Sequence, residues 1–333
     1  NRSNRKNKTI TLMLSRRHIR IKTFLALYAY IFSNNKELDK GERELMFSLK
    51  KVYELYITCL SVFHEIHQLA EEKIENAKTK NLPTEDDLNP NLKFVNNRLF
   101  TLLSQNTQLQ KDIENMKVMW RTDAAFSVIS QTYMEIKKSP EYSGYMNSGA
   151  DNFAEDRNFL VSIFKTYIVN NELLHEVLED SSIFWNDDLD IVALATIKTL
   201  EGMDENDSGF ETLTPLFKDE DDEKYAKLLF RNVVLKENEL EKLISTQTKN
   251  WDVDRLAKTD VILMNMAIVE ALDFPSIPVK VTMNEYIEIS KYYSTPKSKG
   301  FINGILDKIF NQLKNDGKIN KAGRGLINKS IQK

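Results

Sequence analysis

The residues best suited to chemistry are basic and lie near the N-terminus. Arg16, Arg17 and Arg20 are three or four positions apart, so a helix would bring them onto one face. Residues 1–22 contain eight Lys or Arg and no acid. A basic helix face that follows a basic segment predicts a surface that binds phosphate groups.

The charge of the remaining chain limits where such binding can occur. The whole chain has a net charge of −3, and residues 314–333 carry six Lys or Arg against one acid, Asp316. Residues 23–313 therefore carry a net charge of −16. Because an acidic body repels polyanions, we expect nucleic acid to contact the basic ends and local patches only.

Other reactive residue types do not form a recognisable catalytic or metal-binding pattern. His64 and His67 have the spacing of two helical metal ligands, but no further His or Cys lies near them in the sequence. We interpret them as solvent-exposed residues of a helix. The single cysteine, Cys59, excludes an internal disulfide, and we predict a buried thiol in a cytoplasmic protein. The acidic run at 219–223 is typical of the first turn of a helix.

Enzymatic function is not expected. The sequence contains no glycine-rich phosphate loop, nucleophile elbow or paired-carboxylate motif. We therefore predict no catalysis, no cofactor and no bound metal. No apolar run reaches the length that a bilayer requires, so no membrane partner is expected.

The elements that must position the basic residues are helices. Ten Gly and seven Pro are few for this length, and strand patterns are nearly absent, which predicts an all-α protein. We expect helices at about 14–33, 42–78, 92–119, 123–138, 152–179, 188–201, 219–247, 255–272, 279–293 and 297–313, with a loop at 140–151. The helix at 255–272 is apolar on most sides, so it should be the central buried helix.

In the first helix, apolar residues recur at spacings of three and four, which predicts a buried stripe opposite the arginines. The residues of this stripe are Ile21, Phe24, Leu25, Tyr28, Ile31 and Phe32.

Several fragments occur in an order and spacing that are specific when taken together. They are Arg16-Arg17-His18-Ile19-Arg20 followed by Ala26-Leu27-Tyr28, then Trp251 and Arg255, then Ile277-Pro278-Val279-Lys280-Val281, Asn284-Glu285-Tyr286-Ile287-Glu288-Ile289 and Phe301-Ile302-Asn303-Gly304-Ile305-Leu306-Asp307. This combination resembles the NusB family of bacterial transcription antitermination factors. The fold class that follows is an all-α, NusB-like helical bundle with an additional inserted helical region.

The resemblance covers about a third of the chain and suggests six parts. These are a basic flexible extension at 1–13, a first core helix at 14–35, an inserted helical region at 36–200, an acidic linker at 201–218, a C-terminal helical bundle at 219–313 and a basic disordered tail at 314–333. The inserted region could be a separate domain, an extension of the bundle or a dimer interface.

The resemblance implies binding to boxA, a short single-stranded element of ribosomal RNA transcripts. Binding would occur jointly with NusE, a small-subunit ribosomal protein, within the antitermination complex of RNA polymerase. The RNA-binding candidates are Arg16, Arg17, His18, Arg20, Lys22, Lys297, Lys299 and Phe301. His18 stands where the family usually has an arginine, and Lys297 stands where relatives carry an acid, so a cation there should raise RNA affinity.

For the protein partner, the resemblance points to Tyr28 and Asp260. Tyr28 could equally be partly core, and Asp260 could instead face solvent or pair with a nearby lysine. We expect Gly304 to be a point of close helix packing, Asn284 to be a hydrogen-bonding residue at a helix start, and Glu285 to be a surface residue. The competing hypothesis is a helical scaffold that binds only protein and retains the NusB core.

Overall fold

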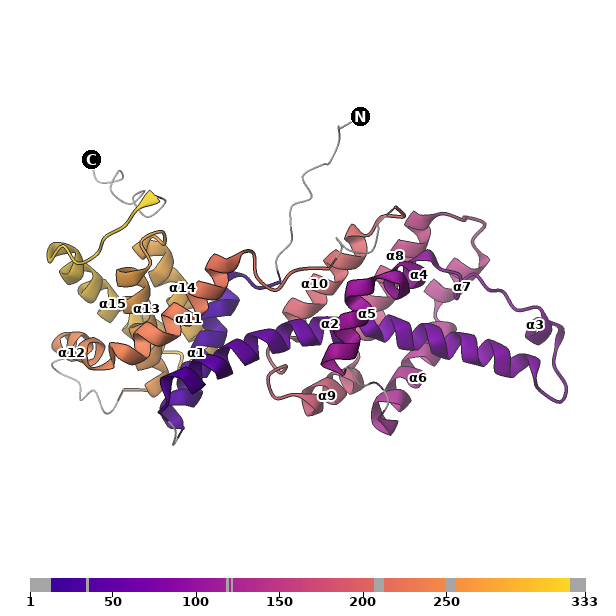
Figure 1. Cartoon of the computed structure of the whole chain (residues 1–333), viewed down its shortest axis with the longest axis horizontal. Coiled ribbons are helices and arrows are strands. Elements are labelled where there is room, and N and C mark those ends of the chain that lie inside the picture. The colour runs from indigo at the N-terminus through magenta and orange to yellow at the C-terminus, as the bar shows by residue number, and fades with distance from the viewer. Residues whose placement is uncertain are drawn as a thin grey trace, which may run out of the picture. The chain divides into compact units, whose positions relative to one another are not determined.

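The computed structural model describes residues 13–33, 36–117, 120, 122–206, 213–248 and 256–323. The regular elements in these ranges are helices, with no strand among them (Figure 1). The all-α prediction is therefore confirmed. No helix in the described ranges is both long and apolar enough to span a bilayer. The basic segment at 1–12 and the motif residues Trp251 and Arg255 lie outside the described residues.

The chain forms two compact units, and each is discontinuous along the sequence. Unit 1 consists mainly of residues 50–218, and unit 2 combines residues 14–49 with the residues from 219 onward. The long helix α2 (Leu38–Lys78) contributes to both units, because the boundary falls within it. Residues 36–49 thus belong to the same unit as the first helix, whereas the sequence pattern placed them in the insertion.

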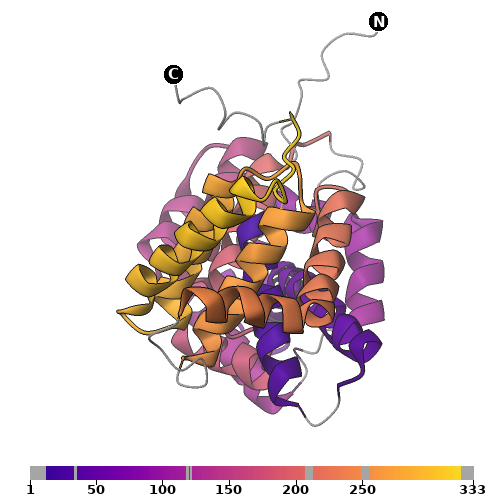
Figure 2. The same cartoon turned by 90° about the vertical axis from the view of Figure 1, so that its left-hand side faces the viewer.

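Unit 2 is a helical bundle built around one apolar helix (Figure 2). Its helices are α1 (Arg16–Phe32), the first part of α2, α11 (Glu220–Leu235), α12 (Glu237–Gln247), α13 (Lys258–Asp273), α14 (Val279–Tyr293) and α15 (Ser298–Asn315). Helix α13 packs against α1, α11, α14 and α15. Because its side chains from Ile262 to Ala271 are all buried, it is the central helix that its composition predicts.

Helix α1 is anchored at its start by a reciprocal cap. Ser15 accepts from the backbone N–H of His18, and the His18 side chain in turn accepts from the backbone N–H of Ser15. The helix buries Ile19, Thr23, Leu27 and Tyr30 together with Phe24. Of the stripe predicted from the sequence, Phe24 is buried, Ile21, Leu25 and Ile31 are half-buried, and Tyr28 and Phe32 are exposed. The buried face is rotated toward the arginine side.

The acidic run at the start of α11 has the structural role expected of it. Asp219 caps the helix by accepting from the backbone N–H groups of Asp221 and Asp222. The acids at positions 220–223 lie in the first turn, where negative charge is stabilised by the helix dipole.

Unit 1 contains more breaks than its sequence predicted. Its elements are the rest of α2, α3 (Glu85–Leu88), α4 (Arg98–Gln105), α5 (Thr107–Met116), α6 (Asp123–Lys138), α7 (Pro140–Asn147), α8 (Phe153–Ile163), the π-helical turn η1 (Phe164–Ile168), α9 (Glu172–Ser181) and α10 (Leu189–Gly202). Asn106 and Asn171 interrupt two segments predicted as continuous helices, because each side chain caps the following helix. The loop predicted at 140–151 contains α7, since Ser139 caps it and Pro140 occupies its first position.

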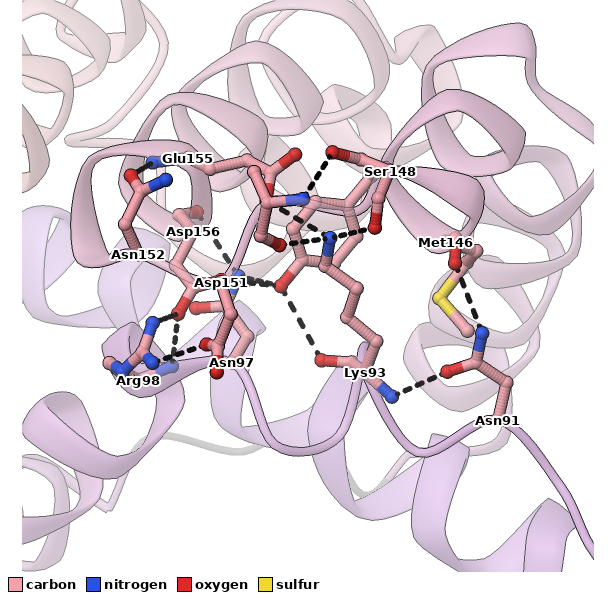
Figure 3. A network of polar contacts seen from close by, with 12 residues as sticks. Asn91, Lys93, Asn97, Arg98, Met146, Ser148, Asp151, Asn152, Glu155 and Asp156 are labelled. Carbon is pink, nitrogen blue, oxygen red and sulfur yellow. Dashed lines mark hydrogen bonds and ion pairs between the residues drawn. The ribbon is translucent and has the colours of Figure 1, made fainter.

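A polar network fastens the loops of unit 1 to each other (Figure 3). Lys93 Nζ donates to the carbonyl of Ser148 at 3.1 Å and to the carboxylate of Glu155 at 2.9 Å. Arg98 pairs with the buried carboxylate of Asp156 at 3.0 Å. These contacts satisfy the buried polar groups of the loops before α4 and α8, so we assign the network a structural role.

The remaining reactive groups of unit 1 take part in packing. Cys59 is buried, as predicted, and burial raises the pKa of its thiol to about 12. We expected His67 to be solvent-exposed, but it is half-buried. Its Nε2 lies 2.8 Å from the carbonyl oxygen of Val95, and its ring centre lies 4.6 Å from that of Phe100. Within the described residues, no group of three or more His, Cys, Asp or Glu is arranged to hold a metal ion.

Candidate nucleic-acid interface

A broad open groove in unit 2 lies between the start of α1 and the first half of α14. It encloses about 900 Å³ and is lined by Ser15, Arg16, Arg17, His18, Arg20, Ser276, Ile277, Pro278, Lys280, Val281, Asn284 and Glu285. The two sequence segments that carry the resemblance therefore meet on one surface. This meeting places Arg16, Arg17 and Arg20 of the predicted basic residues in a concave site.

Arg17 is an exposed cation of this groove. Its guanidinium forms a two-bond pair with Glu285, with Nε and Nη2 donating at 2.8 and 2.7 Å. The hydrogen bond to Glu285 raises the pKa of Arg17, and the same bond lowers the pKa of Glu285. Glu285, interpreted from sequence as a plain surface residue, is instead only 19% exposed and committed to this pair.

Arg16 also lines the groove. Its Nε donates to the buried Asp222 at 3.0 Å, and its guanidinium lies 5.0 Å from the centre of the Tyr225 ring. The carboxylate contact uses Nε, so the guanidinium is held by one edge. Arg16 can therefore be oriented by the protein while it faces a ligand.

Arg20 differs from the exposed residue that its spacing suggested. It is 3% exposed and donates to Glu270 through Nε at 2.7 Å and Nη2 at 2.9 Å. Tyr225 and Thr282 also donate to the carboxylate of Glu270. Burial lowers the pKa of Arg20, but interactions with Tyr225 and Glu270 outweigh this effect and raise it. Arg20 therefore links α1 to α13, and it is too deeply buried to contact a phosphate directly.

His18 lines the groove as a neutral group. Its Nδ1 lies 2.7 Å from the hydroxyl of Ser15. Burial lowers the pKa of His18, and the neighbouring cations Arg17 and Lys22 lower it further. Lys22 itself is buried and lies away from the lining of the groove.

Lys297, Lys299 and Phe301 lie at the start of α15, outside the described lining of the groove. Both lysines are exposed, and Phe301 is half-buried. Glu288 connects this region to the groove electrostatically. A hydrogen bond from Lys291 lowers the pKa of Glu288, and the charges of Arg17 and Lys299 lower it further. Lys299 and Arg17 thus act on the same carboxylate of α14.

The two residues predicted to contact a protein partner have different environments. Tyr28 is 41% exposed, and its ring lies 4.6 Å from that of Phe32, which is 56% exposed. Asp260 is 5% exposed and accepts a hydrogen bond from Ser294. Tyr28 and Phe32 therefore present an apolar surface, whereas Asp260 ties the start of α13 to the end of α14.

The structure corrects two sequence interpretations and adds one cation. Gly304 is exposed, and a Cβ added there would meet nothing within 4 Å, so it is not a point of close packing. Asn284 lies inside α14 instead of at its start, and it is exposed on the same side as Lys280. Sequence reasoning did not assign Lys280 to the site, although its i, i+4 spacing from Asn284 places both on one helix face.

These observations define the class of the protein as an all-helical bundle whose first helix and α14 enclose a basic groove. Residues 192–311 match the sequence model of the NusB family. A NusB transcription antitermination protein from Salinibacter ruber is 38% identical over 137 residues, which cover 39% of this chain and 86% of the relative. The chain belongs to the NusB family.

Two further relatives match shorter stretches. A NusB transcription antitermination protein from Chloroherpeton thalassium is 40% identical over 105 residues, covering 32% of this chain and 50% of the relative. One from Natranaerobius thermophilus is 45% identical over 74 residues, covering 22% of this chain and 53% of the relative. No solved structure matches the chain.

Proposed function

We propose that this protein is a transcription antitermination factor that binds single-stranded RNA of the boxA type. It would act on ribosomal RNA operons in the cytoplasm, together with NusE and the antitermination complex of RNA polymerase. The observation that carries the proposal is the groove that joins Arg16 and Arg17 of α1 to Lys280 of α14. Membership of the NusB family and the names of the relatives support it.

The groove offers the two kinds of group that single-stranded RNA requires. Arg16, Arg17 and Lys280 supply cations for phosphates, while the neutral His18 ring and the Asn284 amide can contact bases. We propose Lys297, Lys299 and Phe301 as an extension of the path beside α14. Arg20 and Lys22 would act indirectly, since both are buried within the bundle.

The exposed Tyr28 and Phe32 give α1 a second surface at its opposite end. We propose that this aromatic pair contacts NusE, because exposed aromatic side chains supply much of the energy of protein interfaces. Phe24, one turn before Tyr28, packs 5.5 Å from the ring of Tyr293, next to the Ser294 that bonds Asp260. Asp260 would therefore act indirectly, by holding the end of α14 against which Phe24 packs.

The direct test compares RNA binding by the wild-type chain and by a variant with Arg16→Ala and Arg17→Ala. We expect the variant to bind a boxA-type RNA more weakly and to show a shallower salt dependence, by about 0.7 in log–log slope per lost phosphate contact. Arg231→Ala is the matched control, because Arg231 is a half-exposed arginine of unit 2 that pairs with Glu42 outside the groove. Equal loss of binding in the control would contradict the site assignment.

One observation favours the protein-only scaffold as a second candidate. The arginines of α1 at positions 16, 17 and 20 are each paired with a carboxylate, which lowers the attraction of the groove for phosphates. The scaffold function is supported if NusE binds the wild-type chain but boxA-type RNA does not bind it, either with or without NusE.

A further inference from the structure

Glu285 stands out among the residues of the groove because it is acidic in a site proposed to bind a polyanion. It is the one carboxylate among the described residues that line the groove. We propose that Glu285 attenuates RNA affinity by occupying the guanidinium of Arg17, so that an RNA phosphate must displace a protein carboxylate. This inference rests on the proposed function, since it concerns the regulation of the same site.

The geometry of the pair makes it a competitor for phosphate. Arg17 uses Nε and Nη2 for Glu285, and this fork is the edge that binds a phosphate or carboxylate with two parallel bonds. The Glu285 carboxylate also lies 3.6 Å from Nη1 of the buried Arg20. Two arginines therefore hold Glu285 in place, and one of them cannot move away.

The exposure of the partners indicates which group would change its contact. Glu285 is 19% exposed, whereas the side chain of Arg17 is 48% exposed. The guanidinium of Arg17 can therefore exchange its carboxylate for an incoming phosphate while Glu285 stays with Arg20. Arg17 could therefore bind an RNA phosphate only by breaking its pair with Glu285.

The neighbouring acids do not share this geometry. Glu288, one turn further along α14, accepts from Lys291 at 2.5 Å and acts on Arg17 through its charge without a bond. Asp222 engages Arg16 through Nε at 3.0 Å, with no second bond to its fork. Glu288 thus provides a matched control, because its neutralisation removes the same charge from the same helix but leaves the Arg17 pair intact.

Glu285→Gln keeps the size of the side chain and weakens the pair. We expect this variant to bind single-stranded RNA about two- to fivefold more tightly, the range that an exposed ion pair supports. Its salt dependence should become steeper by about 0.7 in log–log slope, because one more cation is free to neutralise a phosphate. Glu288→Gln should raise affinity by less than twofold.

The experiment measures fluorescence anisotropy of a boxA-type RNA and of a shuffled RNA at several salt concentrations, with the full chain and both glutamine variants. Each variant is also made in an Arg17→Ala background, where Glu285→Gln should lose its effect. Glu285→Asp, whose shorter side chain cannot maintain both bonds, should give an intermediate affinity and serves if the glutamine variant does not fold.

The outcomes separate this inference from the proposed function. Failure of the wild-type chain to bind either RNA would overturn the proposed function and this inference with it. Two results would overturn only the attenuating role of Glu285, provided that the wild-type chain binds RNA. One is a gain in RNA affinity for Glu285→Gln that is no larger than that for Glu288→Gln. The other is a gain for Glu285→Gln that persists in the Arg17→Ala background.

Discussion

At the scale of single residues, the groove depends on how each guanidinium of α1 is satisfied. Arg20 is buried with Glu270, Arg17 is half-exposed with Glu285, and Arg16 is held by one edge. Spacing predicted that these arginines share a helix face, but it did not predict their carboxylate partners, which lie more than 200 positions away in the sequence. The helical repeat determines which side of the helix each arginine side chain lies on, whereas its carboxylate partner is determined by the tertiary fold.

Replacement of Arg20 by Met should destabilise unit 2 strongly. The change leaves the carboxylate of Glu270 fully buried without its cation, which costs about 3–5 kcal/mol in comparable cases. Urea unfolding followed by circular dichroism measures the loss. Arg231→Ala, which breaks a half-exposed pair with Glu42 and leaves no fully buried charge, should cost only about 1 kcal/mol. A loss of similar size in both variants would contradict the structural role of Arg20.

The lowered pKa of His18 predicts a specific pH response. Burial and the cations Arg17 and Lys22 lower this pKa below 6.5, so His18 is neutral at pH 7 and above. Because the folded state disfavours the protonated ring, His18 should reduce stability as the pH falls below 6.5 and through the lowered pKa.

RNA affinity should respond in the opposite direction to stability over the same pH window. The imidazolium that forms at low pH adds a cation to the groove, so the contribution of His18 to affinity should increase as the pH falls below 6.5. Comparison of binding by the wild-type chain and His18→Asn from pH 8 to pH 5.5 measures this contribution. A difference between them that titrates above pH 7 would show that the ring is charged in the fold.

At the scale of elements, helices α13 to α15 were the most predictable part of the structure, whereas the single helix predicted at 219–247 is divided at Lys236 into α11 and α12. The limits predicted for α14 match the structure at both ends, because Pro278 marks its start and the apolar pattern stops at its end. Helix α7 was missed because the polar, glycine-containing segment after Ser139 resembles a loop when its proline is read as a helix stop. In the structure the same proline begins the helix.

Gly41, in the first part of α2, should not tolerate a side chain. A Cβ there would lie 2.7 Å from ring atoms of both Phe230 and Tyr30, so Gly41→Ala should destabilise the protein by about 1–3 kcal/mol. Gly144→Ala in α7 is the control, since nothing lies within 4 Å and the better helix former should stabilise by up to about 1 kcal/mol. Thermal unfolding of both variants provides the measurement, and stabilisation by Gly41→Ala would contradict the packing at this position.

Helix α1 has a basic N-terminal end and an aromatic C-terminal end, which predicts separable functions. Tyr28→Ala together with Phe32→Ala should weaken binding to NusE at least tenfold, because both rings are exposed and lie next to each other. Binding to RNA alone should change by less than twofold. Calorimetry with NusE and anisotropy with RNA measure the two effects. If the variant loses binding to RNA but not to NusE, the RNA site lies at the aromatic end of α1, which contradicts the prediction.

At the scale of the whole molecule, the net charge of −3 gives no indication of RNA binding, and the basic groove arises only where two distant segments fold together. The sequence predicted the all-helical class and the family, because both depend on local pattern and on short motifs. It did not predict that the boundary between the two units lies inside α2, since that helix has no break in its periodicity at the crossing point.

We expect RNA to bind unit 2 at the groove between α1 and α14. Photo-crosslinking of a boxA-type RNA to the full chain, with and without NusE, followed by mass spectrometry of the crosslinked peptides, tests it most directly. We predict crosslinks within residues 15–18, 276–284 and 297–301. Crosslinks confined to residues 50–218 would place the RNA on unit 1 and contradict binding at this groove.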